Sequence, residues 1–293
     1  MKFGILTLST KNDYRKAIGL ALSARISNPN VPLAVVCQEG IVELLTPYFD
    51  HVIVEKKNLK GFRHKVYLDI YSPFENTFFF DSDVLLFRNL FDITVLWGKQ
   101  SYTAAGQYLN DGFSSFGLDR RSALAETGKS NFVVIDGAGH AFFTAPRCKE
   151  VFDLARLITD RHEEFCGKIP YADEDVMDIV MTKLDLEPAA YADFFSRYLT
   201  AVPGTLKLDA TLGQCEMVAR HSGEFMRPYM MHFAANEAPF PYALQLYKLF
   251  KLNKVDTTGL FMKALSEWIE MEIVRPLKRG VKRLLLSVGL SRN

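Results

Sequence analysis

Two aspartates one residue apart, Asp81 and Asp83, interrupt an otherwise apolar run from Phe78 to Leu86. An ionised carboxylate is costly in such surroundings unless a cation or strong hydrogen-bond donors hold it. Aspartate is also a poor strand former, so local preference does not explain the pair. One interpretation is that a buried strand ends here and delivers both carboxylates to Mg²⁺ or Mn²⁺, which prefer oxygen ligands. The other is a plain Asp-Ser-Asp turn, since both residue types favour turns.

The elements that must position this pair alternate between strand and helix patterns. Apolar strand patterns cover residues 2–9, 31–37 and 51–55, and helical patterns cover residues 13–26, 41–49 and 62–71. This alternation predicts an α/β fold with a doubly wound, mostly parallel sheet and helices on both faces. Ligands bind beyond the carboxyl ends of the strands in such a sheet. That position favours the metal-site interpretation of Asp81 and Asp83.

The middle of the chain contains two further features of interest. After a predicted helix at 90–97 and a strand at 101–108, residues 109–130 are polar and irregular, which indicates a substrate loop. Residues 131–144 resemble a strand broken at Asp136-Gly137-Ala138-Gly139. The glycines permit a bulge or the close approach of a ligand to the backbone, and a simple hairpin turn is the alternative.

Two later positions have both a functional and a structural interpretation. A helix is predicted at 148–166, and Asp173, Glu174 and Asp175 open another that runs to about residue 183. Acids in a first helical turn are favourable against the helix dipole without any other role. His232 lies alone in an apolar strand pattern at 229–233, where a hydrogen-bonded core histidine is common. The presence of Asp81 and Asp83 makes it a candidate third metal ligand.

The composition fits a globular protein that works in a reducing compartment. The 293 residues are 48% hydrophobic and 24% charged, and the net charge of +1 does not fit a binder of nucleic acid or another polyanion. The four cysteines are widely spaced and contain no C-x-x-C pair. We find no secretory segment and no apolar run of membrane-spanning length, and so expect a cytoplasmic location.

The C-terminal segment differs in character from the rest. Residues 275–293 contain six basic residues and no acidic one, and apolar residues recur there at helical spacing. The pattern predicts a basic amphipathic helix that either lies on the anionic inner face of a membrane or docks on the protein body. We therefore divide the chain into a catalytic domain, 1–250, and a helical extension, 251–293.

These motifs resemble glycosyltransferase family 8, which includes glycogenin and bacterial lipopolysaccharide galactosyl- and glucosyltransferases. The resemblance implies the GT-A nucleotide-sugar-binding fold. Asp81-Ser82-Asp83 is similar to the family's Asp-x-Asp motif, and Lys65, 16 positions earlier, is similar to a basic residue that contacts the donor. The family's first strand and loop line its nucleoside pocket, and the similar residues here are Thr7, Leu8, Ser9, Asn12 and Tyr14.

Later motifs extend the resemblance with departures. The Asp136 to Gly139 segment loosely resembles the family's strand end at the donor sugar, and Asp173-Glu174 is similar to its Asp-Gln helix start with Glu in place of the amide.

The late His-x-x-Gly-x-x-Lys-Pro-Trp motif is similar to the stretch that begins at His232 and keeps Pro239. Its lysine position holds Ala238, so Arg220 or His221 is expected to substitute in binding the diphosphate.

The resemblance implies a metal-dependent hexosyltransferase that uses a UDP-sugar and a saccharide, lipid-linked or protein hydroxyl acceptor, with retention. Mn²⁺ or Mg²⁺ would be held by Asp81, Asp83 and His232. The donor would contact Lys65, Ser82 and the first-strand residues, with Tyr14 stacked on the base. The implied catalytic residues are Asp173, Glu174 and Asp136.

Two alternatives remain open at this point. One is a degenerate relative that binds a nucleotide or a membrane surface without turnover. The other is a phosphohydrolase of the haloacid dehalogenase type, whose first motif is also an apolar strand ending in Asp-x-Asp. That motif usually continues with Gly-Thr, whereas Val84-Leu85 follows here.

Overall fold

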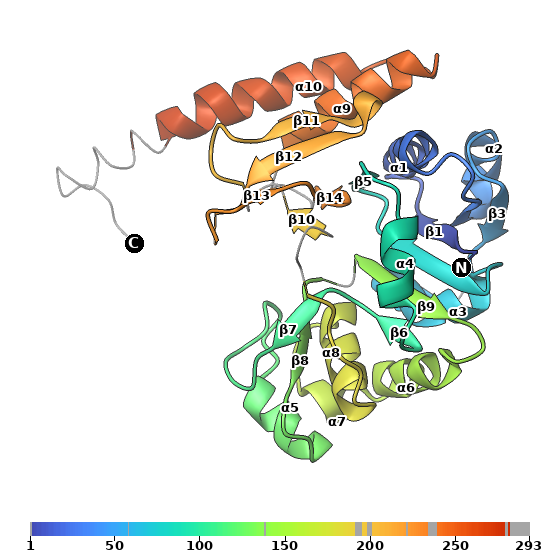
Figure 1. Ribbon diagram of the computed structural model, residues 1–293, viewed down its shortest axis with the longest axis vertical. Coiled ribbons are helices and arrows are strands. Elements are labelled where there is room, and N and C mark those ends of the chain that lie inside the picture. Colours follow the sequence, from blue (N-terminus) through green and yellow to red (C-terminus); the bar gives the residue numbers. More distant parts are fainter. Residues whose placement is uncertain are drawn as a thin grey trace.

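A six-stranded sheet forms the centre of the protein (Figure 1). The computed structural model describes residues 2–57, 59–137, 139–190, 195–197, 201–220, 222–233, 239–278 and 281. The strands of the central sheet are β1 (Gly4–Ser9), β2 (Leu33–Cys37), β3 (His51–Val54), β4 (Asn76–Phe80), β6 (Tyr102–Thr103) and β9 (His140–Thr144). Their order across the sheet is β3-β2-β1-β4-β9-β6.

The first four strands in this order are parallel, and β9 and β6 add antiparallel pairs at one side. The chain moves outward from β1 to β2 and β3, then returns to place β4 on the other side of β1. The carboxyl ends of β1 and β4 therefore flank the point where the strand order reverses. The mostly parallel α/β sheet predicted from the sequence is confirmed.

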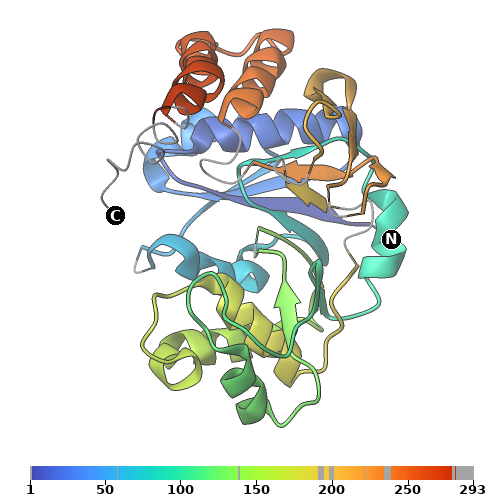
Figure 2. The same cartoon turned by 90° about the vertical axis from the view of Figure 1, so that its left-hand side faces the viewer.

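Two apolar cores, one on each face of the sheet, explain the three consecutive phenylalanines that end β4. Phe78 and Phe80 pack into the core beneath α1 (Tyr14–Ser27) and α9 (Pro239–Leu252). Phe79 points into the other core, with α6 (Lys149–Asp160) and α8 (Asp173–Lys183). Figure 2 shows these two helical layers above and below the sheet. Strands buried on both faces favour runs of hydrophobic residues, and residues 78–80 of β4 form such a run.

Three smaller sheets complete the strand architecture. They are β10-β14-β5, β11-β12-β13 and β7-β8 in spatial order. Their strands are β5 (Val84–Leu86), β7 (Gly106–Tyr108), β8 (Val133–Ile135), β10 (Phe195–Arg197), β11 (Lys207–Asp209), β12 (Gln214–Val218), β13 (Phe225–Met226) and β14 (Met230–His232). The antiparallel pairing of β14 with β5 sets His232 opposite Val84, immediately after the Asp-Ser-Asp segment.

The remaining helical segments are mostly short. They are α2 (Val42–Leu45), α3 (Leu68–Tyr71), α4 (Phe91–Trp97), α5 (Arg120–Thr127), α7 (His162–Cys166), α10 (Leu260–Ile269), 3₁₀ turns at Glu39–Ile41, Gly61–Tyr67 and Ala210–Leu212, and a π turn at Glu270–Val274.

Three predictions of continuous segments are wrong. The expected strand at 101–108 is two strands, since β6 pairs with β9 whereas β7 pairs with β8. The expected helix at 148–166 is interrupted at Arg161 between α6 and α7. The expected irregular loop at 109–130 contains α5. That helix begins where the Asp119 carboxylate accepts a hydrogen bond from the Arg121 N–H, and ends at Gly128 with φ 68°.

The C-terminal helices pack against α1 and against each other. Leu249 and Phe250 of α9 lie in the core, so the expected domain boundary at residue 250 falls inside this helix. Of the basic tail, only 275–278 and 281 belong to the described residues, and the rest of the expected amphipathic helix lies outside them. None of the helices in the described part of the chain is long and apolar enough to cross a membrane.

Candidate active site

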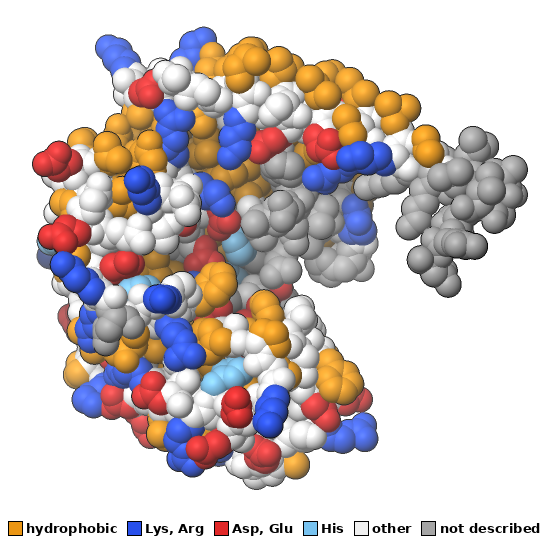
Figure 3. Space-filling model, turned by 180° about the vertical axis from the view of Figure 1, so that it is seen from behind, with side chains coloured by type: hydrophobic (Ala, Val, Ile, Leu, Met, Phe, Trp, Pro, Cys, Tyr) orange, Lys and Arg blue, Asp and Glu red, His pale blue; other side chains and the backbone are white. Residues whose placement is uncertain are grey.

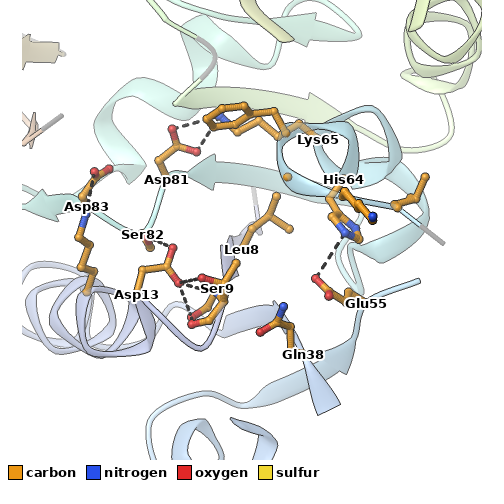
Figure 4. A pocket seen from close by; sticks show the side chains of 16 residues that line it. Leu8, Ser9, Asp13, Gln38, Glu55, His64, Lys65, Asp81, Ser82 and Asp83 are labelled. Carbon is orange, nitrogen blue, oxygen red and sulfur yellow. Dashed lines mark hydrogen bonds and ion pairs between the residues drawn. The ribbon is translucent and has the colours of Figure 1, made fainter. Parts of the chain in front are cut away.

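A cleft of about 430 Å³ lies at the carboxyl ends of β1 and β4. Figure 4 shows Asp81, Ser82 and Asp83 on one side of it, with Gln38 and Glu55 on another. The residues that line the cleft are Leu8, Ser9, Thr10, Asp13, Lys16, Gln38, Glu55, Leu59, Lys60, Gly61, Phe62, His64, Lys65, Asp81, Ser82 and Asp83. The cleft therefore sits where the reversal of strand order places ligand sites in open α/β sheets.

Asp81 shares a buried cation with Asp173. The Lys65 Nζ lies 2.9 Å from Asp81 Oδ1 and 2.9 Å from Asp173 Oδ2. Burial alone would lower the pKa of Lys65, but the two carboxylates more than offset it and raise that pKa. Burial raises the pKa of Asp81, although the Lys65 ammonium opposes the shift. A carboxylate that follows β4 and a carboxylate at the start of α8 thus meet at the same ammonium.

Asp83 has two different partners. Its Oδ1 lies 3.0 Å from His232 Nε2, and its Oδ2 lies 3.4 Å from the Nζ of Lys16 on α1. Burial would raise the pKa of Asp83, but the hydrogen bond with His232 and the positive charge of Lys16 outweigh it and lower that pKa. The Phe233 N–H donates to the Asp83 carbonyl, which holds β14 against the Asp-Ser-Asp segment. A residue 149 positions away is thereby brought to this carboxylate.

Asp81, Asp83 and His232 form a donor set that fits a divalent cation. One ligand atom from each lies within 4.8 Å of the others. Carboxylate oxygens with one imidazole nitrogen suit Mn²⁺ or Mg²⁺. The space beside them is kept by Gly139, because a Cβ there would lie 2.8 Å from Asp81 Oδ2 and 3.0 Å from His232 Cε1. The Gly139 carbonyl also accepts from the Asp81 N–H at 2.8 Å.

Asp13 organises the loop between β1 and α1. Its Oδ1 accepts hydrogen bonds from the Thr10 hydroxyl at 2.9 Å, the Thr10 N–H and the Ser9 hydroxyl at 3.3 Å. Its Oδ2 accepts from the Ser82 hydroxyl at 3.3 Å. The loop after β1 is therefore joined to the segment after β4, which fixes two sides of the cleft relative to each other.

The expected nucleoside-contacting residues divide into two groups in the structure. Leu8, Ser9, Lys65 and Ser82 line the cleft. The other three expected residues are not among the described residues that line the cleft. Thr7 is fully buried in β1 and Asn12 is exposed. Tyr14 is partly buried and packs against the apolar core on the α1 side of the sheet.

The expected catalytic residues are on neighbouring elements. Asp173 is the first residue of α8, is 8% exposed and contacts Lys65. Glu174 follows it and is partly exposed. Asp136 comes directly after β8, is partly exposed, and its N–H donates to the Ala105 carbonyl at 2.8 Å. Of these three residues, Asp173 is the one that the Lys65 ammonium links to Asp81.

Sequence reasoning missed the side of the cleft formed by the ends of β2 and β3. The Gln38 Oε1 accepts from the Lys11 N–H at 3.0 Å. Glu55 Oε2 lies 3.4 Å from His64 Nε2, and His64 Nδ1 lies 3.0 Å from the Tyr71 hydroxyl. Gln38 and Glu55 are polar residues that directly follow two apolar strands. That position in the sequence could have predicted this side of the cleft.

The late motif is only partly visible in the described chain. His221 and residues 234–238, including Ala238, lie outside the described residues. Arg220 is exposed, and its guanidinium donates to the Ala201 carbonyl at 3.2 Å. Arg220 is absent from the described residues that line the cleft.

The sequence matches no protein-family model and no curated protein sequence. Solved structures do resemble the chain. It matches WbbM, a bifunctional glycosyltransferase, with a TM-score of 0.57 and 11% identity, over 90% of this chain and 52% of WbbM. It matches the galactosyltransferase LgtC, solved with donor and acceptor sugar analogs, with a TM-score of 0.54 and 14% identity, over 90% of this chain and 98% of LgtC.

An active-site variant of LgtC gives a TM-score of 0.53 at 14% identity, over 86% of this chain and 95% of that one. The chain thus spans about half the length of WbbM and nearly all of LgtC. It has a glycosyltransferase fold of the GT-A type.

Proposed function

We propose that this protein is a metal-dependent hexosyltransferase of the family 8 kind, which moves a hexose from a UDP-sugar to a hydroxyl acceptor. The observation that supports this most is the meeting of Asp81, Asp83 and His232 at the strand-order reversal of a GT-A fold. The acceptor hydroxyl belongs to a saccharide, a lipid-linked molecule or a protein.

The donor set would hold Mn²⁺ or Mg²⁺ through the two carboxylates and the imidazole. When bound, such a cation neutralises charge that builds on the diphosphate as the sugar leaves. Lys65 orients Asp81 and Asp173, since its ammonium contacts both carboxylates. Asp173 then accepts hydrogen bonds from hydroxyls of the donor sugar.

The nucleoside end of the donor fits the side of the cleft next to β1. Leu8 and Ser9 line it, and Ser82 is oriented by Asp13. Thr7 supports this edge from within β1, while Asn12 and Tyr14 are on the adjoining loop and helix. Stacking of Tyr14 on the base requires its ring to turn from the core toward the cleft.

Transfer with retention requires a group on the sugar face opposite the leaving diphosphate or stabilisation of attack from the same face. Glu174 and Asp136 are the carboxylates that we assign to stabilising the oxocarbenium-like state. Glu174→Gln is expected to reduce turnover and metal-dependent donor hydrolysis by about 100-fold if the carboxylate acts in the chemistry. Unchanged rates would remove Glu174 from this role.

A panel of nucleotide sugars, with and without Mn²⁺, tests the proposed function. We expect metal-dependent hydrolysis of one or more UDP-sugars and calorimetric binding of UDP. UDP binding without hydrolysis or transfer would identify a non-catalytic relative. No binding of any nucleoside diphosphate, together with hydrolysis of p-nitrophenyl phosphate, would instead support the phosphohydrolase alternative.

We further propose that the protein works at the cytoplasmic face of a membrane through its C-terminal helices. Figure 3 shows hydrophobic side chains gathered over α10. Its exposed apolar residues and those that follow are Phe261, Met262, Leu265, Trp268, Ile269, Ile273, Leu277 and Val281. Basic residues in 275–293 would add attraction to anionic lipid. Co-sedimentation with anionic liposomes that persists after removal of 275–293 and replacement of these side chains would contradict this.

A further inference from the structure

Lys16 occupies an unusual place for a surface lysine. It lies in the first turn of α1 and lines the cleft, and its side chain is 31% exposed. Its Nζ lies 3.4 Å from Asp83 Oδ2, on the oxygen that His232 does not contact. One of the carboxylates suited to hold a divalent cation therefore already faces an ammonium.

A divalent cation and this ammonium compete for the same carboxylate. Two positive charges a few ångströms apart in a partly buried site repel each other strongly. Binding of Mn²⁺ to Asp83 would therefore displace the Lys16 ammonium. The flexible four-carbon stem of lysine and its partial exposure allow the ammonium to move within the cleft.

The two other lysines that line the cleft are placed differently. Lys65 is held between Asp81 and Asp173 at 2.9 Å from each, and is 9% exposed. Lys60 is exposed and directly precedes the turn Gly61–Tyr67. Lys16 is the cleft lysine that contacts Asp83 among the described residues, and so the one whose charge is released beside the metal ligands.

We propose that Lys16 alternates between Asp83 and the diphosphate of the donor. In the nucleotide-free protein it is the counter-ion of Asp83. When the cation takes Asp83, the Lys16 ammonium donates a charge-assisted hydrogen bond to a phosphate oxygen of the nucleoside diphosphate. This inference rests on the proposed function and adds the residue that couples metal binding to diphosphate binding.

The test compares metal binding with nucleotide binding in Lys16→Met. Loss of the competing ammonium is expected to tighten Mn²⁺ binding without nucleotide by several-fold, as measured by the electron paramagnetic resonance signal of free Mn²⁺. Loss of the phosphate contact is expected to weaken UDP binding in the presence of Mn²⁺ by about tenfold or more. Uridine, which carries no phosphate, should bind the variant and the wild type equally in calorimetry.

Two further variants keep the test interpretable. Lys16→Arg retains the charge and should bind UDP within about threefold of wild type. Lys99→Met changes an exposed lysine outside the described lining of the cleft and should leave all three affinities unchanged. Circular dichroism and thermal unfolding establish that each variant is folded.

The outcomes separate this inference from the proposed function. If wild type binds UDP with Mn²⁺ and Lys16→Met binds it equally well, the role of Lys16 is overturned and the proposed function stands. Equal weakening of UDP and uridine also overturns it, because the effect is then not on the diphosphate. If wild type binds no nucleoside diphosphate with any metal, both proposals fall.

Discussion

The carboxylates beside the cleft and those within α8 have opposite surroundings. Beside the cleft, Asp81 and Asp173 share the Lys65 ammonium, and Asp83 pairs with Lys16 and His232; these three carboxylates are the cleft set. Within α8, Asp175 and Asp178 are buried in the protein, and burial raises the pKa of both. Asp178 Oδ1 accepts from the Ile135 N–H at 2.8 Å, which holds β8 to the helix. The carboxylates of the cleft set thus face cations, whereas burial favours the neutral form of Asp178, which has a structural role.

Removal of the shared cation should give the largest effect. Lys65→Met leaves Asp81 and Asp173 buried without their counter-ion, so we expect the free energy of unfolding to fall by about 3–5 kcal/mol at pH 7. Urea denaturation measures this change. The double variant Lys65→Met with Asp173→Asn should recover part of the loss, because one uncompensated charge is removed. An unchanged midpoint in Lys65→Met would contradict the stabilising role assigned to the shared ammonium.

Removal of a ligand carboxylate should separate the two sets by function. Asp83→Asn is expected to weaken Mn²⁺ binding by on the order of 100-fold or more, because a neutral amide replaces a charged ligand. Isothermal titration with Mn²⁺ measures the affinity. Asp178→Asn is the matched control and should bind the metal as wild type does. Equal effects of the two substitutions would show that the sets do not differ in the way we infer.

Gly139 lies close to Asp81 and His232, and the importance of its missing side chain can be tested without altering a charge. In Gly139→Ala the new methyl group would lie 2.8 Å from Asp81 Oδ2 and 3.0 Å from His232 Cε1, so both donors must shift. Displacement of ligands by a few tenths of an ångström is expected to weaken Mn²⁺ binding by about tenfold. Gly40→Ala is a suitable control, since no atom lies within 4 Å of its added Cβ. Equal affinities in both variants would contradict the spatial role of Gly139.

The fold and the proximity of Asp81 to Asp83 were accessible from the sequence for a local reason. The apolar run of β4 and the strands before it carry their periodicity in adjacent residues, and Asp81 and Asp83 follow directly. Alternation of strands and helices then placed this strand end in a parallel sheet. The sequence suggested His232 as a third metal ligand only because Asp81 and Asp83 were already candidates. The antiparallel pairing of β14 with β5 explains why His232 lies close to them.

The remaining features depend on tertiary contacts that local pattern does not contain. Lys11, Arg15 and Lys16 are similar cations in the sequence, yet Arg15 pairs with Asp256 at 3.0 Å whereas Lys16 reaches Asp83. The helix α5 was missed because its polar surface resembles a loop, although its capping residues were readable. The split of 101–108 between two sheets depends on partners far along the chain.

The pH dependence of stability should distinguish the neutral acid from an ordinary paired carboxylate. The folded-state pKa of Asp178 is raised well above its ordinary 3.8, chiefly by burial. Between pH 3.8 and the raised folded-state pKa, the unfolded chain releases the Asp178 proton while the folded protein keeps it. The free energy of unfolding of the wild type therefore falls as pH rises through that range. Asp178→Asn lacks this titration, and its amide oxygen can still accept from the Ile135 N–H. We expect it to be more stable than wild type by about 1 kcal/mol or more at pH 7, with the gain vanishing below pH 3.8.

Asp50 gives the opposite sign and serves as the control for this measurement. Burial would raise its pKa, but the Leu33 N–H and Arg25, each 2.7 Å away, lower it below 3.8. A lowered folded-state pKa stabilises the protein above the unfolded value and is lost as pH falls through the folded value. Asp50→Asn should therefore be less stable than wild type at pH 7 and converge with it in acid. Urea titrations at several pH values measure both variants, and parallel curves for the two would contradict the neutral state of Asp178.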